Sequence, residues 1–192
     1  MATVPRTECE RDTALRGERT GAIKAAELLL FYAHGEEIPI AGSRLKQFGI
    51  ALTPTPACPS GEFDETQEQG ESESQSKQDG FLTSIEIATL DLGSPVIVLA
   101  GCNMAHDRSF SASALPGAFF AAGSRIVVGS TREVLSTTTS ALVSRLLAAT
   151  RDGRPAAPAV LEALRQSRQD PSGFGGNSRH PAYWSSWRVM VN

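Results

Sequence analysis

Three short apolar runs recur along the chain, at residues 26–33 (AELLLFYA), 96–100 (VIVLA) and 125–130 (RIVVGS). Each run is shorter than a typical helix and is apolar nearly throughout, a pattern typical of strands that are buried on both faces of a parallel sheet. A fourth run close to the C-terminus, SWRVMVN, is also predicted to be a strand. The hydrophobic pattern therefore predicts a sheet built from short strands.

Segments with helical periodicity separate these strands. FLTSIEIATLDL carries a capping box, because Thr83 or Ser84 can cap a helix and Glu86 follows Thr83 by three residues. Further helices are predicted in ALPGAFFAAG, ending at Gly123, in STTTSALVSRLLAATRDG, ending at Gly153, and at residues 155–168. This alternation predicts an α/β fold in which helices cover both faces of a mostly parallel sheet.

Two stretches between the first and second strands interrupt this pattern. Residues 36–54 contain several Pro and Gly, which favour a loop with one helical turn or short strand. Residues 60–80 hold seven carboxylates against the single Lys77 and almost no apolar side chains, too few to offset the entropy of ordering. We expect a disordered acidic insertion there, either a solvated excursion or a loop for proteolytic processing or regulation. The predicted organisation is a lead-in or helix at residues 1–25 and one domain at residues 26–192.

Composition excludes several function classes. The chain has 192 residues, of which 41% are hydrophobic and 20% charged, and this fits one globular domain. Its formal net charge of -3 and its scattered Lys and Arg provide no basic patch, so we expect no direct nucleic-acid partner. No apolar run approaches the roughly 18 to 20 residues that cross a bilayer, and the N-terminus is too polar for a signal peptide. We therefore expect no membrane association and a cytoplasmic location.

Candidate chemistry collects where two of the apolar runs end. The first run is followed by His34 and Gly35, and the second by Gly101 and Cys102. In open α/β sheets, functional groups gather outside the carboxyl ends of the strands, so these residues are expected in one site. A thiolate is a nucleophile, and histidine is its usual partner. The backbone N–H groups of Gly35 and Cys102 are candidates for an oxyanion hole.

Other interpretations of these residues stay open. A cysteine at a strand end is often a buried small hydrophobe. His106 is a rival partner for the thiol, and Asp107 could orient it. The Cys-x-x-x-His spacing is half of a metal site, but no second pair is present, so we predict neither a metal nor a cofactor. His180 is expected to be structural.

The cysteine usage suits a free thiol. Cys9, Cys58 and Cys102 are an odd number at wide spacings, which argues against a disulfide framework. Neither a G-x-S-x-G nucleophile elbow nor a phosphate-binding loop of the G-x-x-x-x-G-K-[ST] type is present.

Taken together, the segments resemble the carboxyl-terminal portion of the CHAT domain. The resemblance is carried, in order, by FYAHG, LTSIEIATLDL, VIVLAGCNMA, ALPGAFFAAGSRIVVGS, AVLEALRQSRQ and HPAYWSSWRVMV, and it covers residues 28–191 apart from the acidic insertion. CHAT domains belong with the caspases and separases, cysteine peptidases that use a His–Cys dyad. The resemblance implies a caspase-like three-layer sandwich. Because few residues precede the histidine strand, we expect the sheet either to lack its first strands or to be completed by another chain.

The family pattern also implies roles for individual residues. Its strand that ends in His-Gly falls on His34 and Gly35, and its strand that ends in a small residue plus cysteine falls on Gly101 and Cys102. Cys102 would attack a carbonyl of a protein or peptide substrate to form a thioester, and His34 would polarise that carbonyl or protonate the leaving amine. The resemblance thus implies a cysteine endopeptidase, and a helical-repeat (TPR-like) protein as partner or activator.

The chain differs from the family pattern in two loops. AHDRSFSASALPG replaces the usual Glu-Gly pair after the cysteine loop, and TREVLSTTTS replaces the Trp and Asp that usually follow the third strand. These differences support a second hypothesis, a catalytically inactive CHAT-like protein-interaction module. In an active enzyme, Asp107 and Glu133 are candidates for a substrate pocket that attracts a basic side chain.

Overall fold

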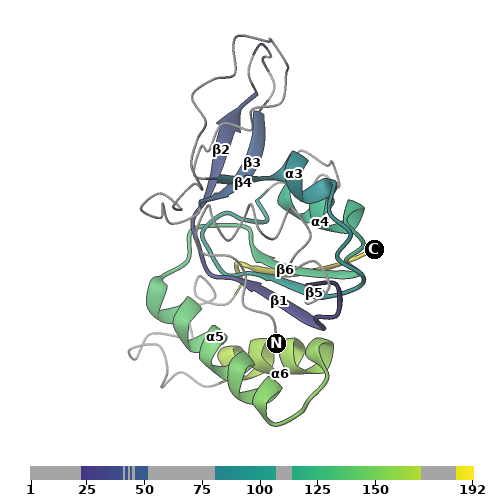
Figure 1. Cartoon of the computed structure of the whole chain (residues 1–192). Coiled ribbons are helices and arrows are strands. Elements are labelled where there is room, and N and C mark those ends of the chain that lie inside the picture. Colours follow the sequence, from purple (N-terminus) through teal and green to yellow (C-terminus); the bar gives the residue numbers. More distant parts are fainter. Residues whose placement is uncertain are drawn as a thin grey trace, which may run out of the picture.

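The computed structural model describes residues 23–40, 42, 44, 46–51, 81–106, 114–169 and 185–192 of the chain (Figure 1). Several predictions fall outside the described residues. These are most of the lead-in at residues 1–25, the acidic insertion at about 60–80, and the positions Cys9, Cys58, Asp107 and His180.

A four-stranded sheet forms the centre of the fold. It consists of β1 (Leu28–Phe31), β5 (Val96–Leu99), β6 (Ile126–Ser130) and β7 (Trp187–Val191), in the order β1-β5-β6-β7. The first three strands are parallel to one another, and β7 runs antiparallel to β6. This confirms the predicted mostly parallel sheet and its terminal strand. No described strand lies beyond β1, which therefore forms one edge of the described sheet.

Helices cover both faces of this sheet (Figure 1). The short helices α3 (Ser84–Ala88) and α4 (Leu115–Ala121) lie on one face, and the longer helices α5 (Ser136–Arg151) and α6 (Ala156–Gln169) lie on the other. Because side chains alternate along a strand, each strand supplies both cores. In β5, Ile97 and Leu99 pack with α3 and α4, whereas Val96 and Val98 pack with α5 and α6. The result is the predicted three-layer α/β sandwich.

The predicted helix boundaries are confirmed where their signals were local. Thr83 is the N-cap of α3, and its side chain accepts a hydrogen bond from the N–H of Glu86 at 3.3 Å. The Glu86 carboxylate in turn accepts from the Thr83 N–H at 2.8 Å, which completes the capping box. Gly123 and Gly153 follow α4 and α5 with positive φ values of 104° and 74°, a conformation that glycine adopts without the Cβ penalty.

A second, antiparallel sheet stands where we expected a loop with one turn or short strand. It is formed by β2 (Gly35–Pro39), β3 (Lys46–Ala51) and β4 (Phe81–Thr83), with β3 in the middle. The alternation that predicts strands is weak here, because Glu36 and Glu37 are both exposed. The last residue of β3, Ala51, pairs with the first residue of β4, Phe81, so the sheet joins positions on either side of residues 52–80.

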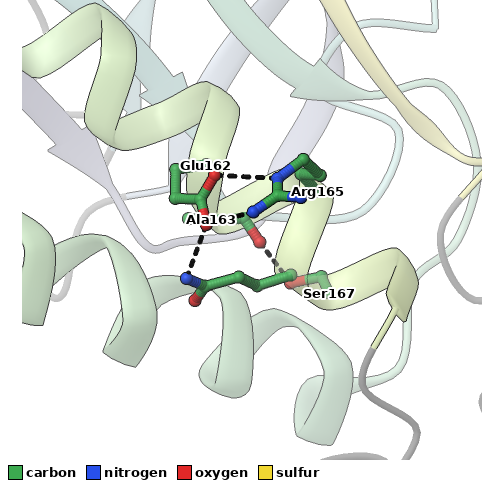
Figure 2. Close-up of polar contacts among 5 residues, drawn as sticks. Glu162, Ala163, Arg165 and Ser167 are labelled. Atoms are coloured by element: carbon green, nitrogen blue, oxygen red, sulfur yellow. Dashed lines mark hydrogen bonds and ion pairs between the residues drawn. The ribbon is translucent and has the colours of Figure 1, made fainter.

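Polar contacts along α6 stabilise the helical layer (Figure 2). Both oxygens of the Glu162 carboxylate accept from the Arg165 guanidinium at 2.9 Å, and Gln166 donates to the same carboxylate at 2.8 Å. These hydrogen bonds lower the pKa of Glu162 from its usual 4.5 to about 2. The buried Ser167 hydroxyl donates to the Ala163 carbonyl at 2.8 Å and accepts from Arg145 of α5 at 3.0 Å, which links the two helices.

Within the described part of the chain, no helix is both long enough and apolar enough to span a membrane.

Candidate active site

The strand register brings the two predicted dyad positions to the same edge of the sheet. Phe31 of β1 pairs with Leu99 of β5, and the Ala100 N–H donates to the Phe31 carbonyl at 2.7 Å. His34 and Cys102 each lie three residues beyond these paired positions. Because the strands are parallel, both residues follow the carboxyl ends, where functional groups of α/β sheets gather.

Two glycines bring the segments that follow β1 and β5 into direct contact. A Cβ on Gly101 would lie 2.0 Å from the Ala33 carbonyl oxygen, so only glycine fits between the two backbones. A Cβ on Gly35 would lie 3.7 Å from the Cys102 carbonyl oxygen and 2.9 Å from Cγ of Met104. The backbone on either side of His34 thus packs against the backbone on either side of Cys102. The catalytic roles of the two side chains stay a prediction.

The sulfur of Cys102 is half-buried and contacts the segment after β6. The Val134 N–H donates to Sγ at 3.5 Å, and the thiol donates to the Val134 carbonyl at 3.5 Å. The Val134 N–H could also donate to the sulfur in its thiolate form. The His34 side chain is exposed, and its backbone carbonyl accepts from the Ala51 N–H at 2.8 Å. The thiol is therefore sheltered and the imidazole is open to solvent.

The turn that carries Cys102 is fixed to the end of β6. The N–H groups of Asn103 and Ala105 donate to the carbonyls of Arg132 and Ser130 at 3.1 and 2.8 Å. Asn103 adopts a positive φ of 57°, which asparagine tolerates better than most residues. The buried Ser130 hydroxyl donates to the carbonyl of Gly101, the residue before Cys102. These contacts fix the position of Cys102 relative to the carboxyl end of β6.

The two predicted oxyanion-hole donors have no backbone acceptor among the described residues. Hydrogen-bonded and non-hydrogen-bonded pairs alternate along an antiparallel ladder. Ala51 donates to His34 directly opposite it, so the next pair, Gly35 and Ile50, is non-hydrogen-bonded and the Gly35 N–H points away from β3. No described backbone carbonyl accepts from the Cys102 N–H. Among the described residues, no backbone carbonyl therefore competes for these two N–H groups, and the oxyanion hole stays a prediction.

The rival histidine, His106, lies at the end of the cysteine turn and contacts the β6 side. Its Nδ1 lies 3.1 Å from the Thr131 carbonyl oxygen, which can only accept, so Nδ1 carries the proton and donates. This contact orients the exposed His106 ring along Thr131.

A hollow of about 250 Å³ lies beside the cysteine turn and was not predicted from the sequence. The residues of the described part of the chain that line it are His106, Thr131, Arg132, Ser185 and Arg188. Glu133, a predicted pocket residue, is exposed and does not line this hollow. The hollow depends on the pairing of β6 with β7, in which the Thr131 N–H donates to the Ser186 carbonyl at 2.8 Å. No local sequence signal joins positions so far apart in the chain.

Metal ligation has no support from the described residues, among which no three His, Cys, Asp or Glu side chains are grouped closely enough to hold an ion.

Comparison with known proteins identifies the family. The family model of the CHAT domain matches residues 10–192, which is nearly the whole chain. The comparison with curated proteins gave no match. The family match agrees with the three-layer fold and with the resemblance found in the sequence. The chain therefore belongs to the CHAT domain family, within the caspase-like peptidase superfamily.

Proposed function

We propose that this protein is a cysteine endopeptidase in which Cys102 is the nucleophile and His34 its partner. The observation that carries the proposal is the close packing of the His34–Gly35 and Gly101–Cys102 backbones, which leaves no room for a Cβ on Gly101. Such packing keeps two segments of the chain in one fixed arrangement, which a two-residue catalytic dyad requires.

The reaction would proceed in two steps. The Cys102 thiol gives its proton to His34, the resulting thiolate attacks the carbonyl carbon of a peptide bond, and the N–H groups of Gly35 and Cys102 donate to the developing oxyanion. The C–N bond breaks, His34 gives a proton to the leaving amine, and the acyl group stays on sulfur as a thioester. Water then attacks the thioester, the carboxylic acid leaves, and the thiol is restored.

A labelling experiment tests the dyad. The wild-type protein is incubated at neutral pH with a mixed library of peptide acyloxymethyl ketones, and thioether adducts are located by peptide mapping. We expect Cys102 to react, and the His34→Ala variant to react about 10²–10⁴-fold more slowly. Cys9 and Cys58 of the same chain serve as internal controls for general thiol reactivity.

Two further variants separate the alternatives. The Cys102→Ala variant identifies the adduct site, and His106→Ala tests the rival base. Labelling that falls with His106→Ala but not with His34→Ala would transfer the partner role to His106. Wild-type Cys102 that reacts no faster than Cys9 and Cys58 would contradict the peptidase.

A second candidate function is a catalytically inactive interaction module. The observation that favours it is the edge position of β1, which pairs with a described strand on one side only. The partner would be a protein, and the family resemblance implies one of the helical-repeat class. The labelling experiment discriminates between the candidates, because an interaction module predicts no selective reaction at Cys102.

A further inference from the structure

Helix α5 begins without a side-chain cap. Its N-cap residue is Leu135, whose apolar side chain cannot accept a hydrogen bond, and its first turn contains no acidic residue. The first hydrogen bond of the helix runs from the Thr139 N–H to the Leu135 carbonyl at 3.0 Å. Among the described residues, no backbone carbonyl accepts from the N–H groups of Ser136, Thr137 and Thr138. These three donors lie at the positive end of the helix dipole, a combination that favours anions.

A buried hydroxyl without a partner lies next to these donors. Thr139 is only 2% exposed, and its Oγ1 has no hydrogen-bond partner in the described part of the chain. Residues three and four positions apart share one side of a helix, so Thr139 lies on the same side of α5 as Ser136 and Leu135. Helical Cα–Cβ bonds tilt towards the N-terminus, which directs the Thr139 side chain towards the first turn. A ligand at the start of α5 would supply the partner that this hydroxyl lacks.

The start of α5 is held next to the thiol. Val134, the residue before the N-cap, donates its N–H to Sγ of Cys102 and accepts from the thiol, both at 3.5 Å. Leu135 is 54% exposed, and Ser136 and Thr137 are exposed as well, so a solute can reach the first turn from solvent. A ligand bound there lies close in the chain to the residue that contacts the sulfur.

The donors suit an oxyanion with several oxygens. A phosphoryl group offers three strong acceptor oxygens, whereas a carboxylate offers two. Three N–H groups and one hydroxyl therefore match a phosphoryl group better than a carboxylate. The charged residues just before the helix, Arg132 and Glu133, are both exposed and carry opposite charges, so no excess of negative charge there opposes an anion.

We propose that the start of α5 binds a phosphate-type oxyanion, either inorganic phosphate or a phosphoryl group carried by a polypeptide. The N–H groups of Ser136, Thr137 and Thr138 donate to its oxygens, and the Thr139 hydroxyl donates a fourth hydrogen bond from the buried side. The site goes beyond the peptidase function and does not depend on it, because none of its residues belongs to the proposed dyad. A polypeptide that carries a phosphoryl group would be held beside Cys102.

An amide titration of the full chain tests the site. Inorganic phosphate is added to the nitrogen-15-labelled protein at neutral pH and constant ionic strength, with chloride and acetate as comparison anions. We expect the amide signals of Ser136, Thr137 and Thr138 to shift together and to saturate with phosphate, and acetate to bind about tenfold more weakly. Shifts that chloride reproduces, or that do not saturate, would overturn the proposal. Equal affinity for acetate would overturn its assignment to a phosphoryl group.

Two adjacent threonines supply the matched variants. Thr139→Val removes the unpaired hydroxyl and should weaken phosphate binding about tenfold or more, because a hydrogen bond to a charged group is lost. Thr138 is equally buried, but its hydroxyl already donates to the Leu135 carbonyl at 2.7 Å. Thr138→Val should therefore leave the affinity for phosphate unchanged. Equal losses in both variants, or a loss in neither, would contradict the role of Thr139.

Thermal unfolding separates ligand binding from a merely structural role. Without phosphate, Thr139→Val should melt at or above the temperature of the wild type, because valine replaces a buried hydroxyl that has no partner. Saturating phosphate should raise the melting temperature of the wild type and leave that of Thr139→Val nearly unchanged. An equal rise in both proteins would count against the site.

A phosphoserine peptide identifies the source of the oxyanion. An acetylated peptide amide with one phosphoserine is compared with its serine counterpart and with inorganic phosphate in the same amide titration. Tighter binding of the phosphopeptide than of inorganic phosphate supports a phosphorylated polypeptide as the ligand, and equal or weaker binding supports the free ion. A serine peptide that shifts the same amides as strongly would overturn the proposal. None of these outcomes depends on Cys102 labelling, so the site and the peptidase can fail separately.

Discussion

Cys102 and His34 leave neighbouring strands at the same edge of the sheet, yet their segments are held in different ways. The cysteine turn is bound by directional hydrogen bonds to residues 130–134, from buried Ser130 and from backbone N–H groups. The histidine segment is exposed and depends on two glycines that allow close backbone packing. We infer that the cysteine turn is sensitive to the loss of polar groups, and that the contact between the two segments is sensitive to added volume.

The largest expected effect comes from adding volume at the contact between the two sides. In Gly101→Ala the new Cβ would lie 2.0 Å from the Ala33 carbonyl oxygen, and a backbone atom cannot move aside without displacing the end of β1. We expect the free energy of unfolding to fall by about 3 kcal/mol and Cys102 labelling to be lost. Urea unfolding measures the first effect and adduct formation the second.

Gly35→Ala is the matched comparison for that variant. Its Cβ would meet Met104 Cγ at 2.9 Å, an atom of a flexible side chain, so a loss of about 1 kcal/mol is expected. Equal losses in the two variants would show that the packing at Gly101 has no special role.

An intermediate effect is expected from removing one polar group on the cysteine side. Ser130→Ala leaves the buried Gly101 carbonyl without its donor, which costs about 1–3 kcal/mol and frees the peptide before Cys102. Ser124→Ala is the control. Ser124 is also buried, and it donates to the Pro95 carbonyl at 2.9 Å near the amino ends of β5 and β6, away from Cys102. Both variants should lose stability, but only Ser130→Ala should slow Cys102 labelling. Equal labelling rates would contradict the positioning role of Ser130.

The smallest effect is expected far from both sides, on α6. The pKa of Glu162 is lowered to about 2 in the folded chain from its usual 4.5, so the ionised carboxylate stabilises the fold above pH 4.5. That contribution is lost as the pH falls from 4.5 towards 2, and solvent screening keeps it small because the ion pair lies at the protein surface, where the Arg165 side chain is 60% exposed. Glu162→Gln should flatten the dependence of unfolding on pH in this range. Cys102 labelling at neutral pH should not change, and a change would show coupling between α6 and the site.

The elements that sequence could predict are those whose signals are local. The apolar runs of β1, β5 and β6 mark strands buried on both faces, and Thr83 with Glu86 marks the start of α3 within four residues. The strand ends that carry His34 and Cys102 followed from the same runs. Such features depend on neighbours along the chain, which the sequence displays directly.

The elements that sequence could not predict depend on distant pairing. The adjacent exposed residues Glu36 and Glu37 break the alternation that would predict β2 as a strand. The partner of β3 on its other side is β4, which follows residues 52–80 in the sequence. The arginine-lined hollow exists because β7 returns antiparallel beside β6 and brings Arg188 towards Arg132. In the sequence, neither arginine differs from an ordinary surface residue. Only the folded structure shows that both line the same hollow.

The pairing of Ala51 with Phe81 has a consequence for how the chain can vary in length. Residues 52–80 connect two directly opposite strand positions, so the distance between the two ends of this stretch is already closed by β3 and β4. The entropy of closing such a stretch grows only slowly with the number of residues in it. Replacement of residues 52–80 by a tight turn, or insertion of a reporter domain there, should therefore leave the histidine and cysteine segments in contact. We therefore expect the chain to tolerate a gain or loss of residues at this position without a change in the contact between these two segments.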